Sequence, residues 1–568
     1  MLRAFASTLV LIAGLLAFVS PVATTVAVNF DVTHRLQHRL APETNGSRIY
    51  AGGMPLEHPG AVTLFYERRG FKPAWSTPEG PNDRADRLLE AIRTVIDDGF
   101  TANHYPLHRL ERALRYAWND PNNTAVMVEL DLMMTDAFMR VAHDLSAGIV
   151  DPSTLGIGIS SFKWDETNLR RIESGIETGR MIEALESFRP RQEQYERLRE
   201  ALKLHLAIAQ KGGWPQVAEG KTLRPGDSDP RVRQIRKRLA ATGDLPRGTS
   251  IYGSKYDDKL ADAVKEFQRR YGLSADGIIG AGTIEAMNIS PAQVARMIEL
   301  NMERWRWLPE DLGRRYLWVD ITGGQLSLTD QDSVRLDMRV MIGRVDDPTP
   351  TFSDTMTYLV INPYWEVPAS IVMKKLYPYF SEDPTFFQRH GIEVYSGWRS
   401  SARRVDAAKV DWKSYDPGYL PFRFRQKPGP LNAMGRIKFM FPNRYDIYIH
   451  DTPSRYLFAR ERYAYTSGCV RVRRPIDLAV TLLEDTHWWT EKRVRRQLRN
   501  GDERILHLKR PIPVHLTYFT VSVMNDGRLQ FHRDIYGWDN LLDSVLDSGA
   551  RQILAANPSA SSGLRSAS

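Results

Sequence analysis

The sequence contains a single cysteine, Cys469, in 568 residues. One cysteine excludes a disulfide bond within the chain. In an exported protein a lone thiol is unusual, because the compartment outside the cytoplasm is oxidising. Such a thiol is either incidental or retained for chemistry, and the residues around it must decide between the two.

Motifs for reading nucleic acid are also missing. The chain has no zinc-ligand spacing, no recognition-helix pattern and no basic tail. Hydrophobic residues make up 42% and charged residues 26%, which is ordinary for a soluble globular protein. The net charge of +9 favours an anionic partner such as nucleic acid, anionic lipid or a carboxylate-rich cell wall polymer. The missing motifs argue against nucleic acid.

Long hydrophobic runs are absent except at the N-terminus. Arg3 precedes a mostly apolar stretch from Ala4 to Val19, and small residues follow as far as Ala27. This pattern predicts a signal peptide over residues 1–27. The stretch is slightly short for a bilayer span of about twenty residues, and an uncleaved N-terminal membrane anchor is the alternative.

Cys469 ends a turn of small residues, Thr466-Ser467-Gly468-Cys469, and His450 lies upstream at the end of a strand-like run. A thiol becomes a useful nucleophile when a neighbouring imidazole takes its proton or pairs with the thiolate. Gly468 leaves backbone amides near Cys469 accessible, and such amides can hold a developing oxyanion. An isolated cysteine and histidine are more often a core residue and a strand-end residue, so the flanking segments carry the interpretation.

The strand-like run before the turn alternates in character. Its alternation places Tyr448 and His450 on one face, and Ile447 and Ile449 on the other. The sequence therefore predicts that Tyr448 lies beside His450.

The N-terminal part of the chain is mostly helical. A polar linker is expected over residues 28–48, followed by a helical domain over residues 49–215. Its clearest helical patterns cover residues 87–96, 127–145 and 181–209. The adjacent His143 and Asp144 do not share a face of a helix, so no candidate chemistry lies in this block.

A compact module is expected over residues 223–288. Apolar residues recur with helical spacing over residues 232–239 and 260–267, and a third short helix is expected over residues 283–288. A connecting helix follows within residues 289–315.

The pattern then changes to short strands. Residues 316–520, with their glycine and proline turns, predict a β-sandwich or a barrel-like sheet. An aromatic-rich insertion over residues 368–427 interrupts the strands and is either a lid or a helical hairpin with packing duties only. Residues 521–546 form a C-terminal extension, and the alanine- and serine-rich residues 547–568 predict a disordered tail.

The segment around Cys469 resembles the signature of the L,D-transpeptidase (YkuD) family, a His followed at a distance by [Ser/Thr]-His-Gly-Cys, an apolar residue and Asn or Arg. The matching residues are His450, Thr466, Gly468, Cys469, Val470 and Arg471. Ser467 stands where the signature has a second His, a departure that is similar to the larger periplasmic, YcbB-like members.

Other segments extend the resemblance. Gly343-Arg344 with Thr349-Pro350-Thr351, residues 362–368 and residues 429–438 match further family segments, with Met434 where Leu is common. Residues 223–288 resemble the peptidoglycan-binding type 1 module. The resemblance implies a multidomain α+β protein with a helical scaffold domain, a small three-helix peptidoglycan-binding module, and a mainly-β catalytic domain carrying an inserted capping subdomain.

The resemblance also implies roles for the site residues. Cys469 would attack the carbonyl between the third and fourth residues of a stem tetrapeptide, and His450 would take and return the proton. The turn residues Thr466, Ser467 and Gly468 would shape the oxyanion site. Arg471 and Tyr448 would bind substrate, although Arg471 equally suits a structural ion pair. Metal ligation is assigned to no residue.

The implied product is a 3→3 crosslink between peptidoglycan stems, formed with release of D-Ala in the periplasm and without a metal or organic cofactor. The implied partners are the donor tetrapeptide and the acceptor diamino acid, with peptidoglycan synthases and carboxypeptidases as neighbours. Two alternatives stay open. A cysteine L,D-carboxypeptidase would use water as the acceptor, and a non-catalytic scaffold would only bind the cell wall through residues 223–288.

Overall fold

The computed structural model describes residues 21–41, 48–100, 105, 107–158, 160, 162–383, 385–399, 401–415 and 419–547. Most of the predicted signal peptide and the tail from residue 548 onward lie outside these residues. The chain divides into two compact units. One holds the residues up to Gly148 together with Phe162–Gln192, and the other holds Ile149–Ser161 together with the residues from Glu193 onward. Among the described helices, none has both the length and the apolar character needed to cross a bilayer.

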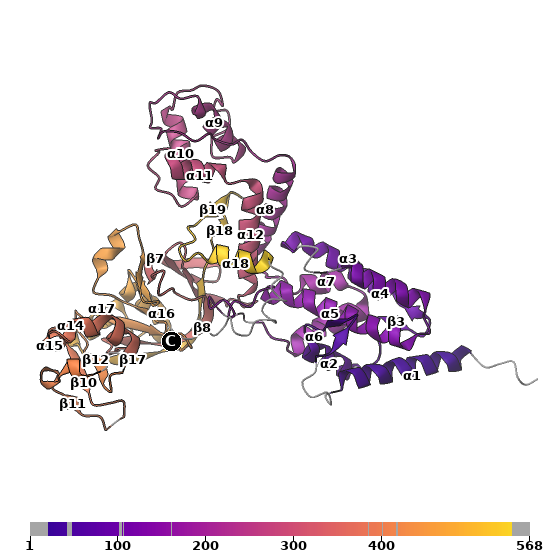
Figure 1. The fold of residues 1–568 in the computed structure, drawn as a ribbon. Helices are drawn as coiled ribbons and strands as arrows, with labels where there is room; N and C mark the ends of the chain where they lie inside the picture. The colour runs from indigo at the N-terminus through magenta and orange to yellow at the C-terminus, as the bar shows by residue number, and fades with distance from the viewer. Residues whose placement is uncertain are drawn as a thin grey trace, which may run out of the picture. The chain divides into compact units, whose positions relative to one another are not determined.

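The first unit is helical and is built around α5 (Thr124–Ala147), which is buried on several sides. The helices around it are α1 (Pro21–Leu40), α2 (Pro59–Arg68), α3 (Asp83–Thr94), α4 (Leu107–Asn119), α6 (Glu166–Thr178) and α7 (Met181–Glu186) (Figure 1). Two short hairpins complete the unit, β1 (Tyr50–Ala51) with β2 (Met54–Pro55) and β3 (Ser76–Thr77) with β4 (Gly80–Pro81). The Asp131 carboxylate on α5 accepts hydrogen bonds from the Ala74 and Trp75 amides and the Ser76 hydroxyl, which fastens the β3 hairpin to this helix.

The linker expected over residues 28–48 is wrong for its first part, because residues 21–40 form α1. Val32, Leu36 and Leu40 recur every fourth residue and are buried, so they give α1 an apolar stripe. The residues between them are mostly polar, so the composition of this segment indicates a linker although its spacing fits a helix.

The second unit begins with a helical part. Its helices are α8 (Glu193–Gln210), α9 (Arg231–Ala241), α10 (Asp258–Arg270), α11 (Ala281–Asn288) and α12 (Pro291–Arg306). Helices α9, α10 and α11 correspond to the three helices expected in the 223–288 module, and α12 is the connecting helix. Helix α8 packs along α12 and shares its core, so it belongs to the second compact unit although it lies within the predicted range 49–215.

The C-terminal extension also belongs to this core. Strands β18 (Val521–Val523) and β19 (Leu529–Phe531) form a separate hairpin that packs against α8, α10 and α12. Arg270 on α10 pairs with the buried Asp244 and donates to the carbonyl of Leu529. Strand β19 therefore lies outside the catalytic sheet, because a buried ion pair and an apolar core hold it on the module.

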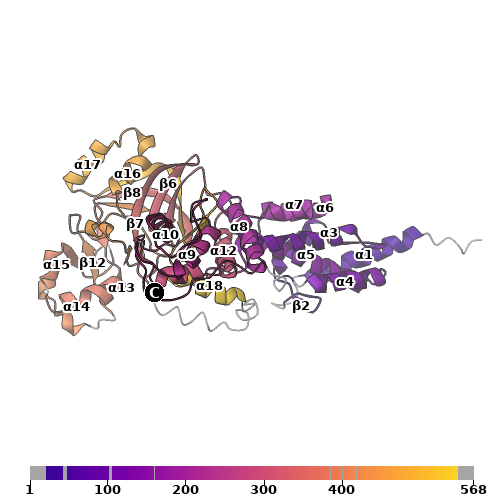
Figure 2. The same cartoon turned by 90° about the horizontal axis from the view of Figure 1, so that it is seen from above.

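The catalytic region is a sheet of nine strands in the order β15-β7-β16-β14-β13-β8-β17-β5-β6. Its strands are β5 (Arg315–Asp320), β6 (Gln325–Asp330), β7 (Ser333–Gly343), β8 (Phe352–Ile361), β13 (Ile437–Met440), β14 (Ile449–His450), β15 (Ala464–Thr466), β16 (Val470–Val472) and β17 (Arg504–Thr517). Figure 2 shows β6, β7 and β8 from above. An additional pairing between β6 and β7 closes the sheet on itself, so the expected barrel-like form is confirmed.

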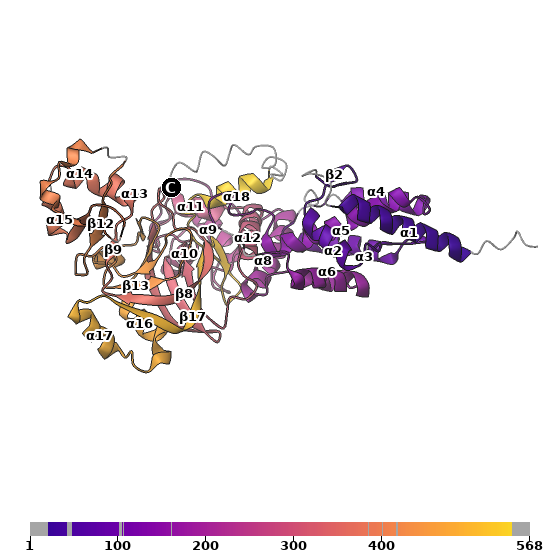
Figure 3. The ribbon, with the colours of Figure 1, turned by 90° about the horizontal axis from the view of Figure 1, so that it is seen from below.

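Helices α16 (Pro475–Leu482), α17 (Glu491–Asn500) and α18 (Trp538–Asp547) pack on the barrel core. Figure 3 shows α16 and α17 side by side next to β13 and β17. Alternation along the strands directs Phe439, Ile449 and Val470 into this core. Their neighbours in sequence, Lys438, His450 and Arg471, must then point to the opposite face of the sheet.

The insertion has an apolar core of its own. Its strands β9 (Trp365–Glu366), β10 (Ile392–Tyr395), β11 (Arg404–Val405) and β12 (Arg423–Gln426) form a four-stranded sheet in the order β11-β10-β12-β9. The short helices α13 (Ala369–Ile371), α14 (Tyr377–Phe380) and α15 (Phe386–Arg389) pack with it, and a π-helical turn spans Val372–Leu376. Phe380, Phe387, Trp412 and Phe424 are buried between them. The alternative of a plain helical hairpin is therefore wrong.

Candidate active site

Strand register brings three basic side chains into one row. Lys438 on β13 pairs with His450 on β14 in an antiparallel ladder, and His450 pairs with Arg471 on β16 in a parallel ladder. Residues directly paired across strands point to the same face of a sheet. His450 therefore lies between two cations on the face opposite Phe439, Ile449 and Val470.

Cys469 immediately precedes β16 and is half-buried. The Val470 amide donates to the carbonyl of Tyr448 over 3.0 Å, which places Cys469 beside the strand that carries Tyr448 and His450. The Cys469 thiol lies 3.9 Å from the carbonyl oxygen of Asp446. The same strand pairing thus brings the predicted nucleophile and base onto neighbouring strands.

His450 is held as a neutral base with a defined tautomer. Its Nδ1 lies 2.5 Å from the carbonyl oxygen of Asp451, so Nδ1 carries the proton and Nε2 keeps its lone pair. Burial lowers the pKa of His450 from 6.5 to about 3, and the charges of Arg471 and Lys438 act in the same direction. A neutral imidazole with a lone pair on Nε2 is the form that a general base requires.

Cys469 rests as the neutral thiol. Burial raises the pKa of its thiol, while the Tyr448 amide and the charges of Lys438 and Arg471 oppose that rise. The two cations therefore disfavour imidazolium and favour thiolate. A proton that leaves Cys469 needs a nearby acceptor, and the cations stabilise the negative charge left on sulfur.

The turn before Cys469 is fixed from both sides. Gly468 has φ +98°, and its carbonyl accepts from the buried Thr349 hydroxyl at 2.7 Å. Thr466 Oγ1 donates to the carbonyl of Cys469 at 2.6 Å. In the part of the chain that the structure describes, the amides of Gly468 and Cys469 donate to no acceptor. No described acceptor competes for these amides, and their role at an oxyanion stays a prediction.

Ser467 contacts the insertion. The Lys375 ammonium, in the π-helical turn, donates to the Ser467 hydroxyl and lies 3.3 Å from Asp347. Asp347 also pairs with Arg344 next to the turn, and these cations hold the pKa of its carboxyl below the usual range. The insertion thus supplies a cation at the position where the family signature carries a second histidine.

Of the two predicted substrate-binding residues, Arg471 belongs to the row of basic side chains and Tyr448 contacts Lys438. Tyr448 lies under the Lys438 ammonium, 3.6 Å from its ring centroid, and burial raises the pKa of Tyr448 to about 12. The Nε of Arg471 is buried and has no hydrogen-bond partner among the described residues. The ion pair considered as an alternative role for Arg471 is not among the described contacts. No group of three or more His, Cys, Asp or Glu side chains within the described residues is placed to hold a metal ion.

Comparisons with known proteins match three parts of the chain to family models. Residues 314–494, less than half of the chain, match the model of the L,D-transpeptidase catalytic domain, YkuD. This part of the chain is therefore similar to a YkuD-family L,D-transpeptidase catalytic domain. Residues 228–287 match the "Putative peptidoglycan binding domain" model, and residues 60–202 match the scaffold domain model.

Two curated relatives are similar to parts of the chain. A "Putative L,D-transpeptidase" from Haemophilus influenzae is 32% identical over 252 residues, which cover 44% of this chain and 50% of that protein. The N-acetylmuramoyl-L-alanine amidase CwlM from Mycobacterium tuberculosis is 36% identical over 80 residues, 13% of this chain and 20% of that protein. The chain thus spans half or less of the length of these relatives.

Two solved L,D-transpeptidases are also similar. The one from Xylanimonas cellulosilytica is 16% identical, with 53% of this chain and 100% of that chain covered and a TM-score of 0.16. The one from Stackebrandtia nassauensis is 13% identical, with 53% and 96% covered and a TM-score of 0.19.

Three residues of the L,D-transpeptidase site are absent from the sequence-based assignment, namely Lys438, Lys375 and Asp347. Lys438 ends the segment 429–438, which resembles a family segment, and this resemblance is the sequence signal that could have indicated it. Lys375 and Asp347 lie far from Cys469 in the sequence and carry no distinguishing pattern. Only the folded chain brings them to the catalytic turn.

Replacing Lys438 with methionine should raise the thiol pKa of the L,D-transpeptidase domain. Methionine keeps the buried stem but removes a charge that favours the thiolate, so we expect the pKa of the Cys469 thiol to rise. The pH dependence of Cys469 alkylation by iodoacetamide measures it. Lys427→Met, which removes a cation paired with Glu393 in the insertion, should leave the profile unchanged. An unchanged profile in Lys438→Met would contradict the role of this charge.

Replacing Gly468 with alanine should damage the catalytic turn. Alanine at φ +98° costs about 1–3 kcal/mol, and its Cβ would lie 2.9 Å from Ile447 Cδ1. Displacing one oxyanion donor typically costs about a hundredfold in rate, so we expect acylation to fall by about that factor. Stopped-flow acylation and thermal unfolding measure the two effects. Gly527→Ala, at φ +83° with open space around it, should cost stability and spare acylation.

The buried, neutral His450 should make the catalytic domain sensitive to acid. Unfolded His450 binds a proton near pH 6.5, whereas the folded residue resists protonation until about pH 3. The unfolded state therefore binds more protons between these values, and stability is lost as pH falls, by about 1 kcal/mol per pH unit. Hydrogen exchange of β13, β14 and β16 measures this slope. His450→Gln should make it shallower, and an equal slope would contradict the shift.

Proposed function

We propose that this protein is a peptidoglycan L,D-transpeptidase that forms 3→3 crosslinks through an acyl-enzyme on Cys469. The observation that carries the proposal is the arrangement of Cys469 and a neutral His450 on neighbouring strands of a YkuD domain, with two cations on the same face. The match of residues 228–287 to a peptidoglycan binding domain supports peptidoglycan as the substrate. The site then acts on the cell wall, and we propose a periplasmic location.

The first half-reaction forms a thioester. The Cys469 sulfur attacks the carbonyl carbon between the diamino acid and D-Ala while His450 Nε2 takes the thiol proton. The amides of Gly468 and Cys469 donate to the resulting oxyanion. The carbonyl re-forms, the carbon–nitrogen bond breaks, and the departing D-Ala amine takes the proton from His450.

The second half-reaction releases the thiol. The side-chain amine of a second stem's diamino acid attacks the thioester and gives its proton to His450. The carbon–sulfur bond breaks, and the sulfur recovers that proton. Arg471, with its buried and unpartnered Nε, is the group that we assign to a substrate carboxylate, with Tyr448 beside it.

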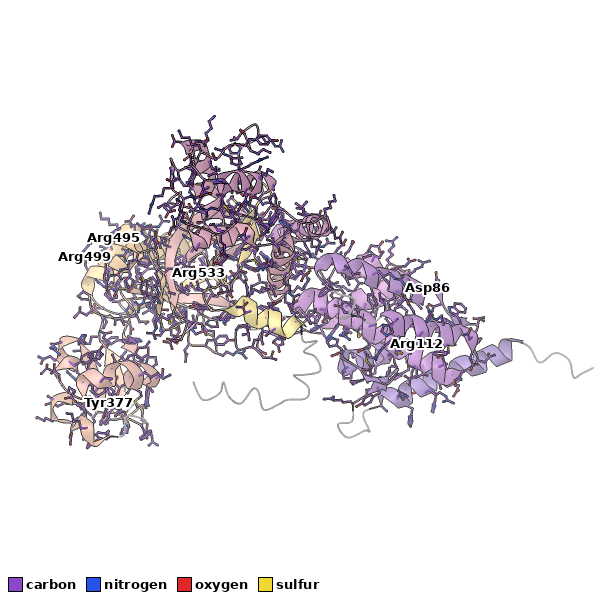
Figure 4. All side chains as sticks on the ribbon, turned by 45° about the horizontal axis from the view of Figure 1, so that its top comes forward. Asp86, Arg112, Tyr377, Arg495, Arg499 and Arg533 are labelled. Carbon is purple, nitrogen blue, oxygen red and sulfur yellow. The ribbon has the colours of Figure 1, made fainter. Side chains whose placement is uncertain are left out.

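The remaining parts have proposed roles as domains. We propose 49–215 as the scaffold region, 223–288 as the wall-binding module, 289–315 as the connecting segment, 316–520 as the catalytic domain, and 368–427 as the cap over its site. Figure 4 labels Tyr377 in this cap, two residues after Lys375. The hydrogen bond from Lys375 to the Ser467 hydroxyl supports a cap that contacts the catalytic turn directly.

Product mass tests the proposal. Purified protein incubated with a tetrapeptide stem should yield a crosslinked dimer and free D-Ala. A tripeptide with D-Ala and no dimer would instead establish the carboxypeptidase. Binding to cell wall sacculi without either product would instead favour the non-catalytic scaffold.

A further inference from the structure

A basic surface lies on the catalytic domain outside the site described above. Helix α17 has the sequence EKRVRRQLRN, with five cations and one carboxylate in ten residues. Two tryptophans, Trp488 and Trp489, lie just before its N-cap residue Thr490. We call Trp488, Trp489, Arg493, Arg496 and Arg504 the α17 patch. These five residues line one surface hollow together with the amides of Gln497 and Asn500.

The cations of α17 are largely unpaired. On α6 and α10, by comparison, arginines pair with carboxylates one turn away, as Arg170 does with Glu166 and Arg269 does with Glu266. On α17 only Arg495 does so, with Glu491. Within the described part of the chain, ion pairs are absent for a group of four α17 cations, namely Lys492, Arg493, Arg496 and Arg499. Figure 4 labels Arg495 and Arg499 on this helix.

The helix that carries these charges is firmly held. Val494 and Leu498 are buried in the barrel core. The Asn362 side chain donates to the carbonyls of Gln497 and Leu498 at the C-terminal end of the helix. Its charged face is therefore presented in a fixed orientation, which lowers the ordering cost of binding.

The aromatic members of the patch lie under its cations. Trp488 is 70% exposed, and the Arg493 guanidinium lies 5.1 Å from its ring centroid. Arg504 lies 5.2 Å from the ring of Trp489. A flat exposed indole offers an apolar surface to a sugar ring, and arginine forks bind carboxylates in a bidentate manner. Both features suit a saccharide that carries carboxylates.

We propose that the α17 patch is a second binding site for peptidoglycan, which takes a glycan strand by sugar contact with Trp488 and stem-peptide carboxylates by Arg493 and Arg496. The proposal rests on the proposed function only for the identity of the polymer. An anionic bilayer is the less suitable occupant, because the apolar residues Val494 and Leu498 face the core. Membrane-surface helices instead turn their apolar face outward into the lipid.

Hydrogen exchange with the full chain tests this site locally, without interference from binding by the 228–287 module. Soluble glycan-strand fragments with stem peptides should slow exchange over residues 486–504. The double variant Arg493→Gln/Arg496→Gln should lose this protection and weaken the affinity read there by about fivefold. Arg112→Gln/Arg115→Gln removes the same charge at the same spacing from the exposed face of α4, and should keep the protection.

The outcomes separate this site from the active site. Acylation of Cys469 by a short stem peptide should be equal in wild type and in the Arg493→Gln/Arg496→Gln variant. No protection of residues 486–504 by the fragments would overturn the second site while leaving the catalytic proposal intact. Protection by vesicles of phosphatidylglycerol but not by the fragments would assign the patch to lipid and also overturn it. If neither the wild type nor the Arg493→Gln/Arg496→Gln variant were acylated, the proposed function would be rejected, and the second binding site would still be judged by the exchange data.

Discussion

Replacing Cys469 with alanine should abolish covalent modification of this protein by a carbapenem or by a tetrapeptide stem. The chain has no other cysteine, so a thioester can form only at this residue. Intact-protein mass should show one adduct on the wild type and none on the variant. Crosslinking turnover should fall by a thousandfold or more, on the order seen when a catalytic nucleophile is removed.

The substitution is structurally mild, which makes the result interpretable. Cys469 is half-buried, and its sulfur has only a weak contact with the Asp446 carbonyl. The turn is held by Thr349 and Thr466, neither of which depends on the thiol. Unchanged thermal unfolding in the variant would show that the fold is intact. An adduct on the alanine variant would reject Cys469 as the nucleophile, and no adduct on the wild type would favour the scaffold alternative.

Much of this site follows from local sequence. The alternation from Ile447 to His450 correctly places both isoleucines in the barrel core, and the small residues at 466–469 indicate the turn. Such features depend on residues that are close in the chain. The period of the apolar residues and the residue types favoured in turns therefore predict them well.

The electrostatics of the site depend on strand pairing, which local sequence does not determine. Lys438 acts on His450 because β13 lies beside β14, and Arg471 acts on it because β16 lies on the other side. A shift of one residue in either register would turn the cation to the opposite face. No sequence motif therefore predicts the low pKa of His450, which depends on its burial and on these two neighbouring cations.

The packing partners of two further segments also depend on the folded chain rather than on local sequence. Helix α8 follows the scaffold helices in sequence but buries its apolar face against α12. The β18–β19 hairpin follows the barrel strands but is held by Arg270 of the module. Each segment has an ordinary amphipathic pattern that shows which face is buried but not which partner buries it.

Replacing His450 with glutamine should slow acylation by about a hundredfold to ten-thousandfold, the usual contribution of a general base. Glutamine keeps a polar side chain of similar size at this position, but it cannot take the thiol proton. The neutral thiol of Cys469 would then react only when water or hydroxide removes its proton. We therefore expect the rate of the variant to rise steeply with pH, because the pKa of this thiol is raised by burial.

His515→Gln provides a matched control. His515 is a second buried histidine of the same barrel, and it contacts Ser353 and the Leu312 carbonyl away from the Cys469 turn. Burial lowers its pKa as well, so its loss should change acid stability but leave acylation intact. Equal acylation by wild type and His450→Gln at every pH would remove the base assignment. A deficit in His450→Gln that shrinks as pH rises would instead be the signature of a lost proton acceptor, since a merely misfolded site would stay slow in alkali.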